Sequence, residues 1–210
     1  IALLNLYRAR NVLAQYASAE TAAMRGIAIY RKVAPDSDNL AYALQELAIS
    51  YQKISKYRES IPLIEQARVI FLKNHDDMSS VVGDTYLNQG ISEEGLKDFD
   101  AALKIYAEAI KRYEASDGKD SLTVGYAINN IAWVYRRLGR YAESEASFRK
   151  ALPILEMKLG PTHFNTNKVY INIGIVSQLQ GKNDEAIRWA MKALTNLNKN
   201  LSTTLDDQRW

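Results

Sequence analysis

Asparagine returns along this chain at nearly constant intervals, at Asn5, Asn88, Asn130 and Asn172, with Glu46 in the remaining place of the series. The interval is the repeat period of the chain, about 42 residues. Asparagine is a poor residue for a helix interior because its amide competes for backbone hydrogen bonds. The same amide carries a donor and an acceptor, so it can pair with the main chain of any extended peptide. We interpret the row as peptide contacts; the alternative is that the amides bond to neighbouring helices as structural spacers.

Other side chains share the helical phase of this row and would lie on the same face. They are Arg8, Tyr126, Asn129, Trp133, Arg136, Arg137, Lys168, Ile171 and Ile175. A tryptophan offers a large rigid ring that anchors a partner side chain, although Trp133 would serve equally to pack two helices together. Arg136 and Arg137 suit a carboxylate, or they form a solvated face. Together these residues predict a ligand that carries acidic residues beside a bulky apolar one.

The chain does not contain the residue patterns that catalysis or metal binding requires. The chain has no cysteine, and its two histidines, His75 and His163, stand in predicted loops without a helical partner four residues away. No glycine-rich phosphate loop occurs, and Gly83, Gly90 and Gly95 fall within predicted helices, where close packing explains them. We therefore expect no enzyme activity, no bound metal and no cofactor.

The elements that hold these residues recur with the same period. A residue that anchors each unit stands at Tyr16, Tyr57, Phe99, Tyr141 and Asn183. Small residues follow each anchor three and ten positions later, and apolar side chains return at helical spacing on both sides of it. Short polar turns precede the anchors, and Gly139 and Gly181 in these turns suit left-handed helix ends. The pattern predicts an all-α solenoid of about five helix-turn-helix repeats, with about ten helices.

One continuous domain is expected over residues 1–198, followed by a tail, or the start of a linker or cap, over 199–210. The repeats fall at approximately 1–33, 34–74, 75–116, 117–158 and 159–198. Apolar side chains at the ends, among them Trp189, Leu194 and Leu197, have no obvious cover in the sequence. Self-association through the terminal repeats is therefore possible, and the chain is expected to belong to a longer protein.

Charge and hydropathy exclude two classes of partner. The 27 Lys and Arg residues against 24 Asp and Glu give a net charge of +3, with the two signs interspersed, which is too mild for nucleic acid. No apolar run approaches the roughly 20 residues that span a bilayer. The absence of cysteine fits a reducing compartment, so we expect a cytoplasmic protein that binds neither nucleic acid nor membrane.

The repeat around Tyr141 resembles the tetratricopeptide repeat (TPR) family. The resemblance rests on Ile131, Ala132, Tyr135, Gly139, Tyr141, Ser144, Phe148 and Ala151. The period is longer than the usual TPR length, and together with a linker such as 158–163 it is similar to the kinesin-light-chain type. The resemblance implies a right-handed superhelix whose first helices line a concave groove, with asparagine at the phase of Asn130 holding peptide backbones.

Three functions follow from these observations. The leading hypothesis is a non-catalytic scaffold that holds a peptide segment, in trans or in cis, along its concave face. The alternative is a regulatory or sensor arm of a larger multidomain protein that docks on a catalytic or switch domain of its own chain. RNA binding through a helical-repeat code fits less well, because the period is longer than in such repeats and the predicted face is not strongly basic.

Overall fold

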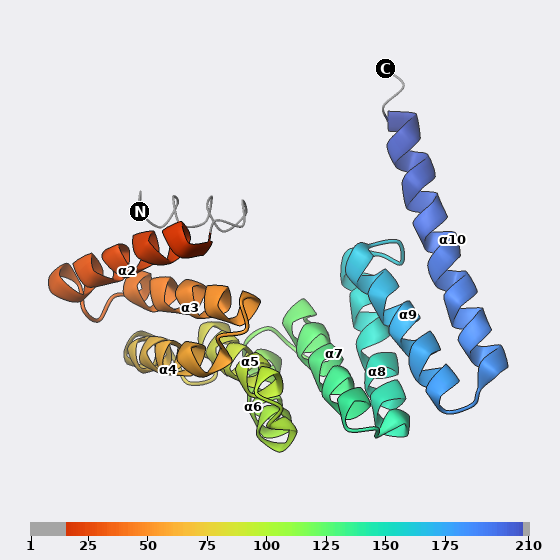
Figure 1. Cartoon of the computed structure of the whole chain (residues 1–210), viewed down its shortest axis with the longest axis horizontal. Helices are drawn as coiled ribbons and strands as arrows, with labels where there is room; N and C mark the ends of the chain where they lie inside the picture. Colours follow the sequence, from red (N-terminus) through yellow and green to blue (C-terminus); the bar gives the residue numbers. More distant parts are fainter. Residues whose placement is uncertain (1–15, 208–210) are drawn as a thin grey trace. The chain divides into compact units, whose positions relative to one another are not determined.

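The computed structural model describes residues 16–207, and the regular secondary structure within this range is entirely α-helical (Figure 1). The helices form successive pairs, as the repeat pattern predicts. Their bounds are α2 Tyr16–Val33, α3 Asp38–Lys53, α4 Tyr57–Asn74, α5 Ser80–Gly95, α6 Phe99–Ser116, α7 Leu122–Arg137, α8 Tyr141–Leu159, α9 Phe164–Leu179 and α10 Asn183–Asp207. The first helix of the expected first repeat lies outside the described residues.

Each second helix begins at the anchor residue of its repeat, so the anchors mark an invariant turn. Two positions earlier the backbone adopts a positive φ, of 62° at Ser55, 66° at Lys97, 72° at Gly139 and 76° at Gly181. This conformation brings the chain back antiparallel after the first helix ends. The left-handed ends predicted for the two glycines are confirmed, and two repeats make the same turn with a residue that has a Cβ atom.

The first helices begin at side-chain caps. The Ser37 and Ser121 hydroxyls accept hydrogen bonds from the backbone N–H groups of Leu40 and Val124. His163 caps α9 through its Nδ1 atom, which accepts from the N–H of Asn165 at 3.1 Å. These caps satisfy donors that the first turn of a helix leaves unpaired. His163, which the sequence places in a loop, therefore lies at a helix start.

The described residues fall into two compact units, 16–116 and 117–207. In the first unit, the described core includes Leu44, Leu47 and Phe71. In the second, it includes Phe148 and Tyr170. The division coincides with the expected boundary between the third and fourth repeats, and the single continuous domain expected from the repetition stays a prediction.

Three glycines of α5 let neighbouring aromatic rings approach the helix backbone. A Cβ atom added at Gly90 would lie 2.5 Å from Cε1 of Tyr106, and one added at Gly83 would lie 2.9 Å from Cε1 of Tyr113. Gly95 is approached in the same way by an aromatic ring of α4. The close packing predicted for these glycines is confirmed.

Consecutive repeats stack because the first helix of one packs on the helix pair of the repeat before it. In the first unit, α5 packs on α3 and α4, and the Gln52 amide donates to the Asn88 carbonyl at 2.7 Å. In the second unit, α9 packs on α8. There the Glu145 carboxylate accepts hydrogen bonds from Gln180 Nε2 at 2.7 Å and from Lys182 Nζ at 2.8 Å.

Candidate functional site

A polar pocket of about 260 Å³ opens in the second unit between α7 and α9. Leu155 of α8 contributes apolar surface to its wall. The lining side chains are Tyr126, Asn129, Trp133, Leu155, Asn165, Lys168, Ile171 and Asn172. Because α7 and α9 are the first helices of consecutive repeats, the pocket lies on the helices that the sequence predicts for ligand binding.

Two asparagines in the pocket keep their amides unused. Asn172 is only 5% exposed, and Asn129 is half-buried. Among the described residues, neither side chain has a hydrogen-bond partner. No amide atom of either residue is among the fully buried polar atoms that lack a partner, so these amides face the open pocket. A bound peptide would pair with them there, because each amide offers one acceptor and two donors.

Contacts with neighbouring side chains fix the orientation of the aromatic rings in the pocket. The Trp133 ring packs edge-on against Phe148, with 6.5 Å between centroids, and the guanidinium of Arg136 lies 3.9 Å from the Trp133 ring. The Tyr126 hydroxyl accepts a hydrogen bond from Asn165 Nδ2 at 2.9 Å. Trp133 therefore packs against the core and also lines the pocket, and its contact with a partner side chain stays a prediction. Fixed rings lose little freedom when a ligand binds, which favours affinity.

The charge around the pocket is positive. Lys168 is exposed, and its Nζ atom lies 4.3 Å from the ring of Phe164, which is itself 67% exposed. Burial lowers the pKa of Arg136, and the neighbouring Arg137 lowers it further. Arginine stays protonated at neutral pH even so, which leaves the pocket edge suited to an anionic group.

The structure brings six residues of the predicted face into this one pocket. They are Tyr126, Asn129, Trp133, Lys168, Ile171 and Asn172. Asn130, Arg136 and Arg137 lie on α7 but do not line it. Asn88 belongs to the first unit, where its backbone carbonyl accepts a hydrogen bond from Gln52 Nε2, and Asn5 and Arg8 lie outside the described residues.

Two lining residues were not predicted. Asn165 stands one turn before Lys168. The equivalent place of the preceding repeat holds a threonine, Thr123, so Asn165 does not belong to a periodic row of asparagines. Leu155 belongs to a second helix, and a reading confined to first helices omits it. The repeat pattern alone does not predict which side chains point into the space between two helices.

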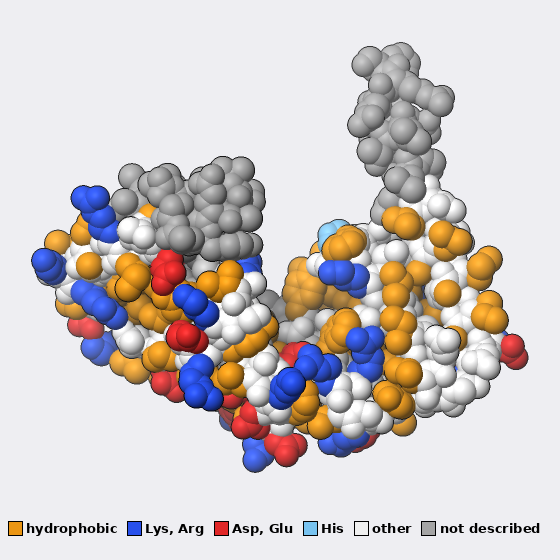
Figure 2. Space-filling view, in the orientation of Figure 1, with side chains coloured by type: hydrophobic (Ala, Val, Ile, Leu, Met, Phe, Trp, Pro, Cys, Tyr) orange, Lys and Arg blue, Asp and Glu red, His pale blue; other side chains and the backbone are white. Residues whose placement is uncertain are grey.

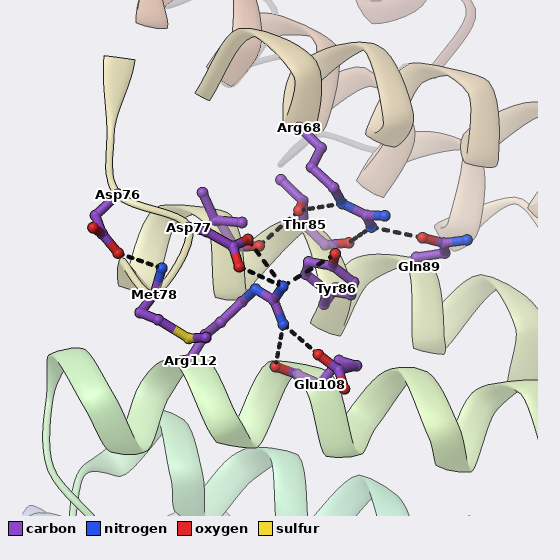
Figure 3. Close-up of polar contacts among 10 residues, drawn as sticks. Arg68, Asp76, Asp77, Met78, Thr85, Tyr86, Gln89, Glu108 and Arg112 are labelled. Atoms are coloured by element: carbon purple, nitrogen blue, oxygen red, sulfur yellow. Dashed lines mark hydrogen bonds and ion pairs between the residues drawn. The ribbon is translucent and has the colours of Figure 1, made fainter. Parts of the chain in front are cut away.

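A polar cluster in the first unit contrasts with the pocket because its members are paired with one another (Figure 3). The ring of Tyr86 lies between two guanidinium groups, 3.8 Å from that of Arg68 and 3.9 Å from that of Arg112. Arg112 is 5% exposed and bonds to the carboxylates of Asp77 and Glu108. These contacts tie α4, α5 and α6 together, so the cluster is structural.

Comparison with known proteins identifies the family. A family model for the tetratricopeptide repeat matches residues 81–157 and 127–199, which together span more than half of the chain. The chain belongs to the TPR family. Its type is kinesin-light-chain-like: it is 26% identical over 163 residues to Protein KINESIN LIGHT CHAIN-RELATED 2 of Arabidopsis thaliana. That alignment covers 76% of this chain and 24% of the relative, so the chain spans about a quarter of the relative's length.

Solved structures show the same TPR fold. BtubC (BKLC) from P. vanneervenii matches with a TM-score of 0.79 and 20% identity, covering 91% of this chain and 76% of that one. Aspartyl phosphate phosphatase F from Bacillus subtilis matches with a TM-score of 0.81 and 18% identity, covering 94% and 50%. At this identity the likeness extends to the fold alone.

The TPR fold makes this chain a protein–protein interaction scaffold in general terms. Within residues 16–207, no helix combines the length and apolarity needed to cross a membrane. The described part of the chain also contains no group of three acidic or histidine side chains placed to hold a metal ion. Repeat proteins of this type are typically non-catalytic scaffolds.

Proposed function

We propose that the α7/α9 pocket binds an extended segment of a partner protein, with acidic residues beside a bulky apolar one. The observation that carries this proposal is the amide of Asn172, which belongs to a side chain only 5% exposed, lines the pocket and has no partner in the described part of the chain. Asn129 faces the same pocket with a second unused amide. Two amides on neighbouring first helices suit a peptide backbone that crosses both.

The remaining pocket residues define the ligand. Trp133 and Ile171 offer apolar surface for one bulky side chain. Lys168 offers a cation at the edge, and Arg136 and Arg137 extend the positive charge along α7. An acidic residue near the bulky one would meet this charge, which raises the association rate and the specificity more than the affinity.

The experiment is selection of short displayed peptides on the 210-residue chain, followed by affinity measurement for the best sequences. A hydrogen bond from an amide is worth about 0.5 to 1.5 kcal/mol, so Asn172→Ala or Asn129→Ala should weaken binding roughly two- to tenfold. Asn198→Ala, which removes an exposed amide from α10, serves as the matched control and should leave the affinity unchanged. Equal affinity in all four proteins would refute the pocket as the site.

The other members of the predicted set are tested in the same assay. Asn130→Ala measures whether the asparagine row contributes outside the pocket. Lys168→Glu reverses a pocket charge and should weaken acidic peptides more at low salt than at high salt. A loss that does not depend on salt would contradict a charge contact at Lys168.

The second candidate is docking in cis, in which the ligand is a segment of a longer polypeptide that contains this chain. The curated relatives are about four times as long as the part this chain matches, so such proteins hold the additional segments that docking needs. Peptides from the flanking regions of the full polypeptide should then outcompete the selected ones at the pocket. Failure of every flanking peptide to compete would leave docking in trans.

A further inference from the structure

A second, larger concavity of about 600 Å³ runs between α9 and α10 and differs from the pocket in being apolar and uncharged. Hydrophobic side chains gather over α9 and α10 on the face shown in Figure 2. The groove is lined from both helices, chiefly by Ile171, Ile175, Ile187, Leu194 and Leu197. We call this surface the α9/α10 groove.

The apolar residues of this groove are unusually exposed. Ile187 is 61% exposed, Leu194 52% and Leu197 48%. Contiguous apolar surface of this kind on a soluble helical protein marks an interaction site more often than isolated exposed residues do. The two leucines project from the second helix of their repeat, in the place where the solenoid normally receives the next helix.

The equivalent grooves inside each unit are filled by a helix. Leu152 and Leu155 of α8 stand one repeat before Leu194 and Leu197, and they pack with Tyr170 of α9 in one core cluster. In the first unit, α5 fills the groove of α3 and α4. The α9/α10 groove therefore continues an interface that the chain builds twice, and a helix is the shape that fits it.

The helices that fill the two inner grooves share a spacing. In α9 the inward positions are Thr166, Val169, Tyr170, Ile173 and Val176. In α5 they are Val82, Thr85, Tyr86, Gln89 and Ser92. Both sets follow i, i+3, i+4, i+7 and i+10, which is one face of a helix, and β-branched or aromatic residues occupy most of its places.

Two unused polar groups in the groove point to the same occupant. Asn167 is 8% exposed and lines the groove, and its Oδ1 atom has no hydrogen-bond partner in the described part of the chain. Gln178 also lines the groove, and it stands at the same place in its repeat as Gln52, three repeats further along the chain. Gln52 donates to the backbone carbonyl of Asn88 on the helix in its groove. Gln178 is placed to do the same for a helix in the α9/α10 groove.

We propose that the α9/α10 groove docks a single amphipathic helix from a partner protein. The helix presents β-branched or aromatic residues at i, i+3, i+4, i+7 and i+10, and an N–H or O–H donor to Asn167. A partner is the source because Ile171 lines both the groove and the α7/α9 pocket, so residues that flank a pocket-bound segment reach the groove. The choice of source rests on the proposed function; the helical shape of the occupant does not.

The test uses a helix-stabilised peptide with the sequence of residues 164–180, because α9 is a helix that fills such a groove. Its binding to the 210-residue chain is followed by fluorescence anisotropy. Leu194→Asp and Leu197→Asp should each weaken binding at least about tenfold, as expected when a charge replaces an apolar anchor. Both leucines are about half exposed, so these variants should fold. Met191→Asp is the matched control, since Met191 is 58% exposed on the same helix but does not line the groove.

Several outcomes separate the possibilities. A probe with aspartate at the positions of Val169 and Ile173 should not bind. Asn172→Ala should leave probe binding intact, so a failed peptide pocket and a failed helix groove are distinguished. Equal loss in the Met191 control, or no binding of the stabilised probe, overturns the helix site. A concentration-dependent dimer in light scattering that Leu194→Asp abolishes overturns the partner and assigns the groove to a second copy of the chain.

Discussion

Substitution of Gly90 by alanine tests whether the α5 glycines are required for packing. The added methyl would lie 2.5 Å from Cε1 and 2.6 Å from Cδ1 of Tyr106. Optimal contact between carbon atoms is about 3.5 to 4.0 Å, so the overlap is about 1 Å with two atoms at once. Tyr106 is fully buried, and its hydroxyl donates to Glu94 at 3.1 Å, which prevents the ring from turning away.

Two opposing effects set the magnitude. Extra volume in a packed core costs about 1 to 3 kcal/mol. Alanine is more favourable than glycine in a helix interior by about 1 kcal/mol. Because the overlap at Gly90 involves a fixed ring, the packing cost lies at the upper end, and the free energy of unfolding should fall by about 1 to 2 kcal/mol.

Urea denaturation followed by circular dichroism measures this change. Gly90→Ala is compared with the same substitution in a Tyr106→Leu background, where the colliding ring edge is absent. In that background the helix-propensity gain should dominate, and Gly90→Ala should raise stability by up to about 1 kcal/mol. An equal loss in both backgrounds would show that the ring of Tyr106 does not cause the cost, and the packing explanation would fail.

Three further predictions concern turns and titrating groups. Lys97→Gly should stabilise the fold by about 0.5 to 1 kcal/mol because Lys97 has a φ of 66°, whereas Gly139→Ala should destabilise it by a similar amount; thermal melting compares the two. Burial raises the pKa of Glu145, but hydrogen bonds, led by that from Lys182, outweigh burial and leave the pKa below its usual 4.5. Glu145→Gln should thus cost about 1 to 3 kcal/mol at neutral pH, and the difference from the wild type should shrink as the pH falls below 4.5. Burial and a hydrogen-bonded carboxylate raise the pKa of Tyr51 to about 12, so stability should fall as the pH rises from 10 towards 12, and less so in Tyr51→Phe.

The fold was predictable because similar residue types recur at the same positions of successive repeats. The anchor at Tyr57 begins a helix, and so do its counterparts at Phe99 and Tyr141. Gly139 identified the turn, but Ser55 and Lys97 make the same turn without glycine, so residue type alone would have missed it. Periodicity supplied those positions, because a solenoid must turn at the same point in every unit.

The candidate site was predictable only in part, because a periodic phase specifies a face and not the partner of each side chain. Asn88 and Asn172 share one phase. The side chain of Asn172 lines the α7/α9 pocket, whereas Asn88 lines neither that pocket nor the α9/α10 groove. What separates them is the neighbouring helix, whose side chains vary from repeat to repeat. Trp189, expected to lack cover, instead stacks on Tyr170 with 5.9 Å between ring centroids.

The two proposed sites meet on one helix for a reason that follows from solenoid packing. A first helix contacts the preceding repeat, its own second helix and the following repeat, so it needs apolar residues on several sides. In α9, Ile173 is fully buried while Ile171 and Ile175 are exposed. Ile171 is shared by the pocket and the groove. Ile171→Asp should therefore weaken the binding of both the pocket peptide and the groove helix, whereas Leu197→Asp should weaken the binding of the helix alone. If Ile171→Asp weakens only one of the two ligands, the pocket and the groove are independent sites and not one continuous binding surface.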